Sequence, residues 1–191
     1  MKLKIASALI ASAALLPVAA SAEGLSYSYL ELAYVEADID GVDEDADGFA
    51  LAGSLEITDE VFMFANYGDL SVGPVDFETY SVGGGYAWSF SPKADLYGTL
   101  AYVKAEADLS GFGSADDDGY GIGVGIRSRV AEQFELEAAI NYVDLSDSGD
   151  DTTLGLGARW YFVDQLALGF GVEFGDDADA YSLSLRWEFG G

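Results

Sequence analysis

The chain has 191 residues, half of them hydrophobic, and 34 acidic residues against 8 basic ones give it a formal net charge of −26. A protein of that charge repels nucleic acid and other anionic partners. Cys and His are both absent, which excludes disulfide bonds, thiolate and imidazole metal ligands, and the Ser-His or Cys-His pairs of many hydrolases.

The first residues match a secretory signal peptide. Lys2 and Lys4 form a positive start, residues 5–16 an apolar core, and residues 20–22 a small-residue cleavage site, Ala-Ser-Ala. The alternative, a helical membrane anchor, requires roughly 20 apolar residues, and this core is shorter. We therefore expect residues 1–22 to be removed on export and residues 23–191 to form one domain.

The remainder of the chain alternates large apolar side chains with small or polar ones, the period of half-buried strands. No later segment has an uninterrupted apolar run of transmembrane-helix length. Ten alternating segments follow in chain order: 25–38, 48–57, 61–70, 77–88, 94–106, 119–130, 134–145, 152–162, 166–175 and 180–189. They predict an all-β protein, an antiparallel barrel of ten strands, or of eight if short hairpins merge or fail.

The sixth segment shows the alternation most clearly. Glycines and two arginines share one of its faces, and four large side chains share the other: Tyr120, Ile122, Val124 and Ile126. The third segment is undecided, because Phe62 and Phe64 compete for the apolar face with Val61, Met63 and Tyr67.

The connections between the segments alternate in length. Tight turns are expected at residues 58–60, 89–93, 131–133 and 163–165, and longer, Asp-rich loops at residues 39–47, 71–76, 107–118, 146–151 and 176–179. Transmembrane barrels have short periplasmic turns and longer outer loops. With an even number of strands and an amino terminus on the periplasmic side, every long connection falls at the outer surface.

The two faces of the strands differ in a way that places the barrel in a membrane. The polar face is mainly Gly, Ala, Ser and Thr, which suits a crowded lumen and would be a poor solvent surface for a soluble ligand-binding barrel. Tyrosines occur near the long-loop ends of the apolar faces: Tyr34, Tyr67, Tyr80, Tyr102, Tyr120, Tyr142 and Tyr181. A second group lies near the short-turn ends: Tyr86, Trp88, Trp160, Phe162, Trp187 and Phe189. Two aromatic girdles are typical of the two membrane interfaces, whereas aromatic residues of a soluble core would not favour strand ends.

Two segments resemble a known family. Residues 24–31, followed by Tyr34 and Val35, resemble the first strand of small outer-membrane barrel proteins of the Ax (activator of immunity) type, and the mature chain is similar to the OmpA-like barrel superfamily. Alternate large residues near the carboxyl terminus resemble the signal read by the barrel-assembly machinery, except that Gly190 and Gly191 follow the last aromatic residue. The resemblance implies an outer-membrane barrel and carries little information on activity.

An acidic connection contains half of a calcium-binding motif. Asp43, Asp45 and Asp47, followed by Gly48, match the first half of an EF-hand loop, in which alternate carboxylates converge on one cation. The position of the bidentate Glu is occupied by Ser54. The alternatives are therefore a calcium site and a solvated acidic loop. The other acidic loops suggest either divalent ions shared with lipopolysaccharide phosphates or adaptation to high salt.

Charged residues on the polar face predict a network inside the lumen. Buried charges are costly unless paired, so inward arginines and glutamates at similar depth are expected to form ion pairs. The predicted members are Arg127, Arg129, Arg159, Arg186, Glu31, Glu56, Glu135, Glu137 and Glu188. Such a network can act as a plug that stabilises the barrel, or as a gate or selectivity filter.

We therefore expect a non-enzymatic protein of the Gram-negative outer membrane that stabilises the envelope or presents its loops, with its lumen closed by the network. The alternative is a narrow, cation-preferring pore. Glu135 and Glu137 could act as an acid and a base, but pairing with arginine explains them better. Calcium is the only candidate cofactor. Expected partners are outer-membrane lipid, lipopolysaccharide and the barrel-assembly machinery, with no nucleic acid, and the sequence does not indicate an oligomeric state.

Overall fold

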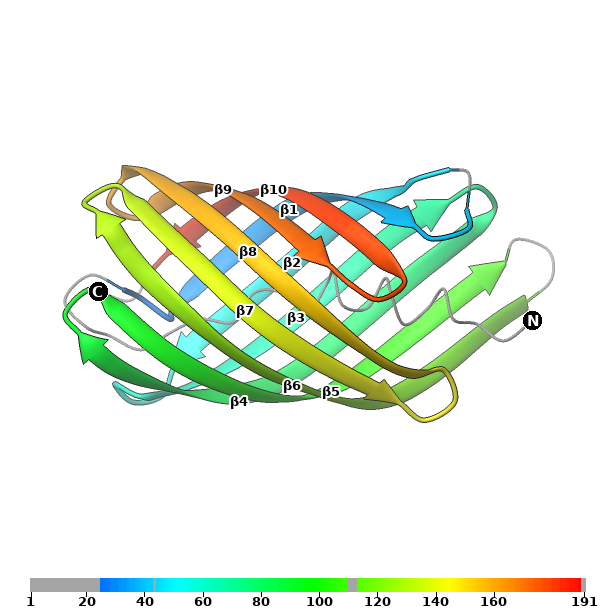
Figure 1. Ribbon diagram of the computed structural model, residues 1–191, viewed down its shortest axis with the longest axis horizontal. Helices are drawn as coiled ribbons and strands as arrows, with labels where there is room; N and C mark the ends of the chain where they lie inside the picture. Colours follow the sequence, from blue (N-terminus) through cyan, green and yellow to red (C-terminus); the bar gives the residue numbers. More distant parts are fainter. Residues whose placement is uncertain (1–24, 43, 110–112, 190–191) are drawn as a thin grey trace.

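The computed structural model describes residues 25–42, 44–109 and 113–189 (Figure 1). They form ten strands: β1 (Tyr29–Ile39), β2 (Ala46–Glu56), β3 (Val61–Val72), β4 (Val75–Ser91), β5 (Ala94–Leu109), β6 (Gly113–Ala131), β7 (Phe134–Leu145), β8 (Gly149–Val163), β9 (Leu166–Phe174) and β10 (Ala178–Glu188). Every strand pairs antiparallel with its sequence neighbours, and β1 pairs with β10 to close the barrel. The predicted ten-stranded barrel is confirmed, and the eight-stranded alternative is wrong.

Some predictions fall on other parts of the chain. The predicted signal peptide, residues 1–22, and Asp43 of the half EF-hand motif lie outside the described residues. Within the described part, no helix is both long and apolar enough to cross a membrane.

Alternate side chains on each strand face the lumen and the exterior. On β1, Glu31 and Val35 point inward and are buried, whereas Leu32 points outward and is exposed. The undecided third segment is resolved in the same way, with Phe62 and Phe64 inside. They fit there because β4 places glycines opposite them: a Cβ atom added at Gly85 would lie 2.0 Å from Phe62 Cζ, and one at Gly83 would lie 2.8 Å from Phe64 Cζ.

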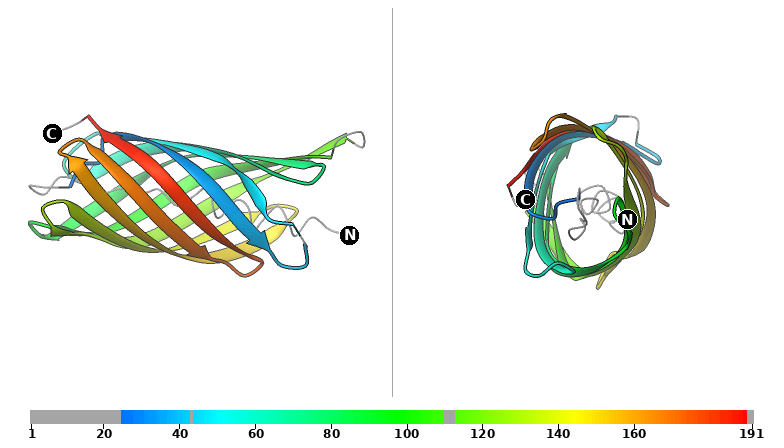
Figure 2. Two further views of the ribbon diagram at one scale, coloured as in Figure 1. Left: turned by 90° about the horizontal axis from the view of Figure 1, so that it is seen from above. Right: turned by 90° about the vertical axis from the view of Figure 1, so that its left-hand side faces the viewer.

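Two predicted long loops are largely strand. Residues 71–76 form a tight hairpin between β3 and β4, with Gly73 in the left-handed region at φ 55°. Of residues 107–118, those from 107 to 109 continue β5 and those from 113 to 118 begin β6. Hydrogen bonding between neighbouring strands therefore continues beyond the point where the sequence turns polar. Following the orientation expected from the sequence, we call the end that carries the turns at residues 92–93, 132–133 and 164–165 the periplasmic end, and the opposite end the outer end. The β3–β4 and β5–β6 hairpins project from the outer end (Figure 2).

The exterior changes character along the strands. On β6 the exposed Ile126, Val124 and Ile122 are followed by Tyr120 and then, toward the outer end, by Asp118. The two predicted sets of girdle aromatics point outward at the two margins of the apolar band. Beyond the tyrosines the pattern inverts, because the exterior is acidic and the inward side chains form an apolar cluster that includes Val35, Ile39, Leu70, Val72 and Phe77. The outer end therefore has a polar exterior and an apolar interior, whereas the band below it has an apolar exterior.

Candidate functional site

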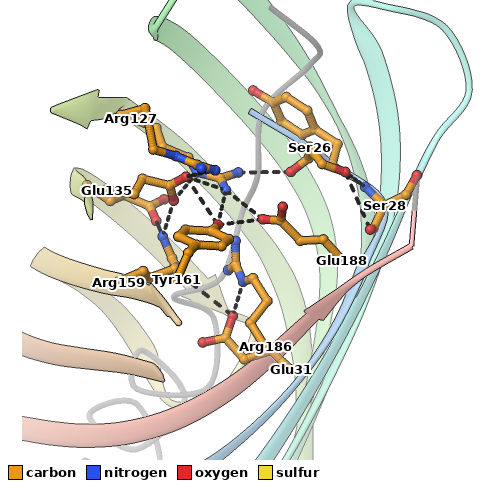
Figure 3. Close-up of polar contacts among 12 residues, drawn as sticks. Ser26, Ser28, Glu31, Arg127, Glu135, Arg159, Tyr161, Arg186 and Glu188 are labelled. Carbon is orange, nitrogen blue, oxygen red and sulfur yellow. Dashed lines mark hydrogen bonds and ion pairs between the residues drawn. The ribbon is translucent and has the colours of Figure 1, made fainter. Parts of the chain in front are cut away.

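The predicted charged residues gather inside the periplasmic end of the barrel (Figure 3). Their positions follow from strand parity and register: Arg129 lies opposite Glu135, which in turn lies opposite Arg159, and Glu31 lies opposite Arg186. Directly opposed residues on one face of a sheet are close enough for their side chains to meet. The register therefore brings positive and negative side chains together without a long-range rearrangement of the backbone.

Glu135 is the centre of the cluster. Arg127 donates to it twice, with Nε 2.5 Å from Oε1 and Nη2 2.9 Å from Oε2. Arg159 Nη1 donates to Oε1 at 3.0 Å, and Arg129 Nη2 donates to Oε2 at 3.4 Å. Glu135 and Arg127 are fully buried. A bidentate guanidinium pair of this kind is both stronger and more specific in direction than a single ionic contact.

A second group of contacts extends the cluster across the lumen. Arg159 Nη1 also donates to Glu137 Oε2 at 2.7 Å, and its Nε lies 4.0 Å from Glu31 Oε2. Arg186 Nε donates to the same Glu31 oxygen at 2.5 Å. The remaining two nitrogens of Arg186 make no hydrogen bond within the described structure, and its guanidinium lies 3.9 Å from the centre of the Tyr29 ring. Ion pairs thus connect β6, β7, β8, β10 and β1.

Inward tyrosines complete the network, and sequence reasoning missed them. The Tyr161 hydroxyl donates to Glu188 Oε1 at 2.5 Å, and Arg129 lies over the Tyr161 ring at 3.9 Å. The Tyr97 hydroxyl donates to Glu137 Oε1 at 2.6 Å. The alternation of each strand could have identified them. Tyr97 and Tyr161 lie between outward-facing neighbours, so their side chains must face the lumen and cannot belong to an aromatic girdle.

The residues before β1 fold into the periplasmic mouth. We call residues 25–28 the N-terminal segment; the sequence predicted them to be strand, but β1 begins at Tyr29. Arg127 Nη1 donates to the carbonyl oxygen of Ser26 at 3.2 Å, and the Tyr27 hydroxyl donates to Asp95 at 3.4 Å. Glu56 accepts the backbone N–H of Tyr27 at 2.7 Å. Glu56 thus holds the N-terminal segment, and within the described residues it forms no ion pair with an arginine.

A small cavity adjoins the ion pairs on the side that faces the outer end of the barrel. Glu31, Glu137 and Arg159 contribute to its lining, and its walls include glycines of β8 and β9, among them Gly157 and Gly169. Its volume of about 40 Å³ is enough for a few water molecules, since one water needs roughly 10 to 15 Å³ by a comparable measure. The arrangement leaves room for water beside the network but not for a larger solute.

The acidic motif between β1 and β2 has a different geometry from that of an EF-hand loop. β2 begins at Ala46, so Asp47 lies in an extended strand, opposite Glu36, and its carboxylate accepts the Tyr34 hydroxyl at 3.3 Å. Within the described residues, no group of three or more carboxylates is arranged to hold a metal ion. Because Asp43 lies outside those residues, calcium binding by Asp43, Asp45 and Asp47 stays a prediction.

Comparison with known proteins agrees with this geometry. Residues 5–162 match the model of the outer membrane protein beta-barrel domain. The chain belongs to this family. The protein is therefore an outer-membrane protein, and the apolar band is the surface that faces lipid. The match is to the family as a whole and does not distinguish the Ax type within it.

Several solved structures are similar to the chain at low sequence identity. The NanC porin is 8% identical with a TM-score of 0.54, over 84% of this chain and 100% of that one. The KdgM porin is 12% identical with a TM-score of 0.48, over 84% and 99%. Ail of Yersinia pestis is 18% identical with a TM-score of 0.44, over 84% and 95%. No curated protein matches the chain. At 8% identity the likeness to the NanC porin concerns the fold alone.

Proposed function

We propose that this barrel is a non-enzymatic protein that stabilises the outer membrane or presents its outer hairpins, and that its lumen is closed at the periplasmic end. The observation that carries the proposal is the buried pairing of Arg127 and Arg159 with Glu135 on neighbouring strands. The same two arginines reach across the lumen, Arg127 to Glu188 at 3.4 Å and Arg159 to Glu31 at 4.0 Å. A ten-stranded barrel is only slightly wider than the eight-stranded kind that side chains fill. Long guanidinium groups directed inward from several strands therefore occupy much of its cross-section.

Buried aromatic side chains occupy the lumen next to the network. Tyr27, Phe62, Phe64 and Tyr97 pack together in one buried cluster, with the Tyr27 and Phe62 ring centres 4.7 Å apart. The ionic network and the aromatic cluster meet at Arg127, which lies 5.9 Å from the centre of the Tyr27 ring. These contacts support a plug made of wall side chains and the N-terminal segment.

The same contacts argue against catalysis. The chain lacks His and Cys, and the two carboxylates that could act as acid and base, Glu135 and Glu137, already accept bonds from Arg159. A carboxylate held by guanidinium groups is a weak general base, because proton uptake would break those bonds. Binding partners fit better than a substrate: outer-membrane lipid, lipopolysaccharide contacted through shared divalent ions, and, during assembly, the barrel-assembly machinery.

A narrow cation-preferring pore is the second candidate. The observation that favours it is the acidic exterior of the outer end, where Glu36, Asp38, Asp116 and Asp118 are exposed. Carboxylates at a mouth raise the local cation concentration and would bias a conducting lumen toward cations. In this reading the arginine network is a filter and not a plug.

Conductance in planar bilayers separates the two candidates. We expect the unmodified protein to show little or no conductance, and the Arg127→Ala/Arg159→Ala variant to show small cation-selective steps, because unpaired glutamates and water then replace the ion pairs. Lys93→Ala is the matched control, since it removes a positive charge from an exposed periplasmic turn without touching the lumen. Steady cation-selective conductance of the unmodified protein would support the pore and exclude the plug.

A further inference from the structure

A second polar cluster lies in the lumen wall away from the arginine network. It consists of Asp151 and Thr153 on β8 and Glu173 on β9, all pointing inward. Their exposed fractions are 2%, 2% and 5%. Inward glycines on both strands, such as Gly155 and Gly171, separate this cluster from Arg159. The ion pairs of the periplasmic end therefore do not explain it.

The cluster has acceptor atoms without partners. Asp151 Oδ2, Thr153 Oγ1 and Glu173 Oε2 make no hydrogen bond within the described structure. The other oxygen of Asp151, Oδ1, accepts the backbone N–H of Asp176 at 3.2 Å. The charges of Asp151 and Glu173 repel each other. No described Lys or Arg pairs with either carboxylate. A buried carboxylate is costly without a positive partner, and here two occur together.

Gly175, which follows β9, lies close to these side chains. A Cβ atom added there would lie 2.8 Å from the carbonyl oxygen of Ala178, 3.3 Å from Thr153 Cγ2 and 3.5 Å from Asp151 Oδ2. The Asp151 carboxylate therefore reaches over the backbone of Gly175 toward β9, the strand that carries Glu173. A larger residue than Gly at this position would restrict the approach of a ligand to that carboxylate.

We propose that Asp151, Thr153 and Glu173 bind one divalent metal cation, with calcium preferred, in the outer half of the lumen. Two carboxylates neutralise the charge of such an ion, and the hydroxyl supplies a further oxygen ligand. Calcium takes six to eight oxygen ligands in flexible geometry, so water completes a site that has only two carboxylates, whereas magnesium demands a stricter octahedron. The site is independent of the half EF-hand motif and of whether the lumen conducts.

The test is calcium titration of the refolded barrel in detergent after removal of divalent ions by a chelator. The Asp43→Asn/Asp45→Asn/Asp47→Asn background removes binding by the acidic loop. In this background we expect one calcium ion per chain, and we expect Asp151→Asn/Glu173→Gln to weaken its affinity at least ten-fold. Magnesium alone should bind more weakly than calcium. Asp150→Asn/Asp179→Asn is the matched control, because it removes two exposed carboxylates at the same end of the barrel.

Three results would overturn the proposal. The first is that no calcium binds in the Asp43→Asn/Asp45→Asn/Asp47→Asn background, and the second is that the matched control loses as much calcium affinity as the double variant. The third is that acid stabilises the barrel while calcium has no effect on its stability. The last result would mean that the two carboxyl groups share a proton. Heat-modifiable migration on gels reports whether each variant is folded. If the double variant fails to fold, Thr153→Val provides the second measurement, because it removes one ligand without changing charge and should still weaken calcium binding.

Discussion

Glu135 accepts hydrogen bonds from three guanidinium groups in a space that excludes solvent. We expect Glu135→Gln to lower the free energy of unfolding by about 3 to 5 kcal/mol, the usual effect of breaking a buried ion pair, because three cations then lose their shared anion. Urea unfolding in lipid vesicles measures this. Glu132→Gln, an exposed change in the adjoining turn, is the control, and equal stability of the two variants would contradict the central role of Glu135.

At the residue scale, parity was enough to predict which charged side chains face the lumen. Arg127, Arg159 and Glu135 follow directly from alternation. The partner of Glu56, the backbone of Tyr27, could not be predicted in this way. Leu25, Tyr27 and Tyr29 alternate with polar residues as a strand does, although residues 25–28 enter the barrel mouth before β1 begins. Alternation reports the side on which a residue lies but not where the backbone leaves the sheet. Asp151 and Glu173 were missed for another reason, since acidic residues near loops resemble a solvated rim.

The β7–β8 hairpin is tied to its neighbour by one carboxylate of β6. Asp117 Oδ2 accepts the backbone N–H groups of Ser148 at 2.7 Å and of Asp147 at 3.1 Å. We expect Asp117→Ala to increase hydrogen exchange of the Ser148 amide at least about ten-fold, since a hydrogen bond to a charged group contributes roughly 1.5 to 3 kcal/mol. The global unfolding midpoint should change little, because this contact lies beyond the apolar band.

The control for that hairpin is Asp150→Ala, which removes an exposed carboxylate from the same hairpin. If the hydrogen-exchange rate of the Ser148 amide is unchanged in Asp117→Ala, or rises equally in the control, the hairpin is held by other contacts. Hydrogen exchange followed by NMR resolves the individual amide.

At the element scale, the strands were predictable in number and facing but not in length. Residues 107–118 are rich in Asp and Gly, which is typical of a loop, and yet β5 and β6 pair through most of them. Lys104 forms an ion pair with Glu106 on the same strand and a second one with Asp116 on β6, so polar outward side chains support the hairpin in water. A polar sequence marks the end of the apolar band, and the sheet continues past it.

Across the whole molecule, the arrangement of exposed apolar residues defines where the barrel meets the bilayer. Tyr34, Tyr120 and Tyr181 mark one margin and Trp88, Trp160 and Trp187 the other, all exposed on the exterior. This level of organisation was predictable, because strand count, parity and aromatic placement are repeated in every hairpin. The inverted outer end was not, because Val72 and Val75 lie in residues 71–76, which the sequence assigned to a loop, and Leu70 and Phe77 lie at the very ends of the strands predicted on either side.

Placement of the bilayer can be tested with two outward substitutions at different heights. Val124 lies in the middle of the apolar band on β6, and Glu36 lies above the tyrosine margin on β1; both side chains point outward. An arginine at the bilayer midplane costs about 2 to 4 kcal/mol in barrels of this kind and close to nothing near the interface. We therefore expect Val124→Arg to lower the free energy of unfolding in vesicles by that amount, and Glu36→Arg to leave it nearly unchanged.

The unmodified protein and Glu36→Arg should fractionate with outer membranes and migrate differently on gels before and after boiling, because a closed barrel resists detergent until heated. Val124→Arg should show a smaller folded fraction in the same assay. Equal destabilisation by the two arginines would mean that the bilayer extends beyond the tyrosines to the acidic part of the strands. Recovery of the unmodified protein as a soluble periplasmic species would contradict the assignment of the apolar band to lipid.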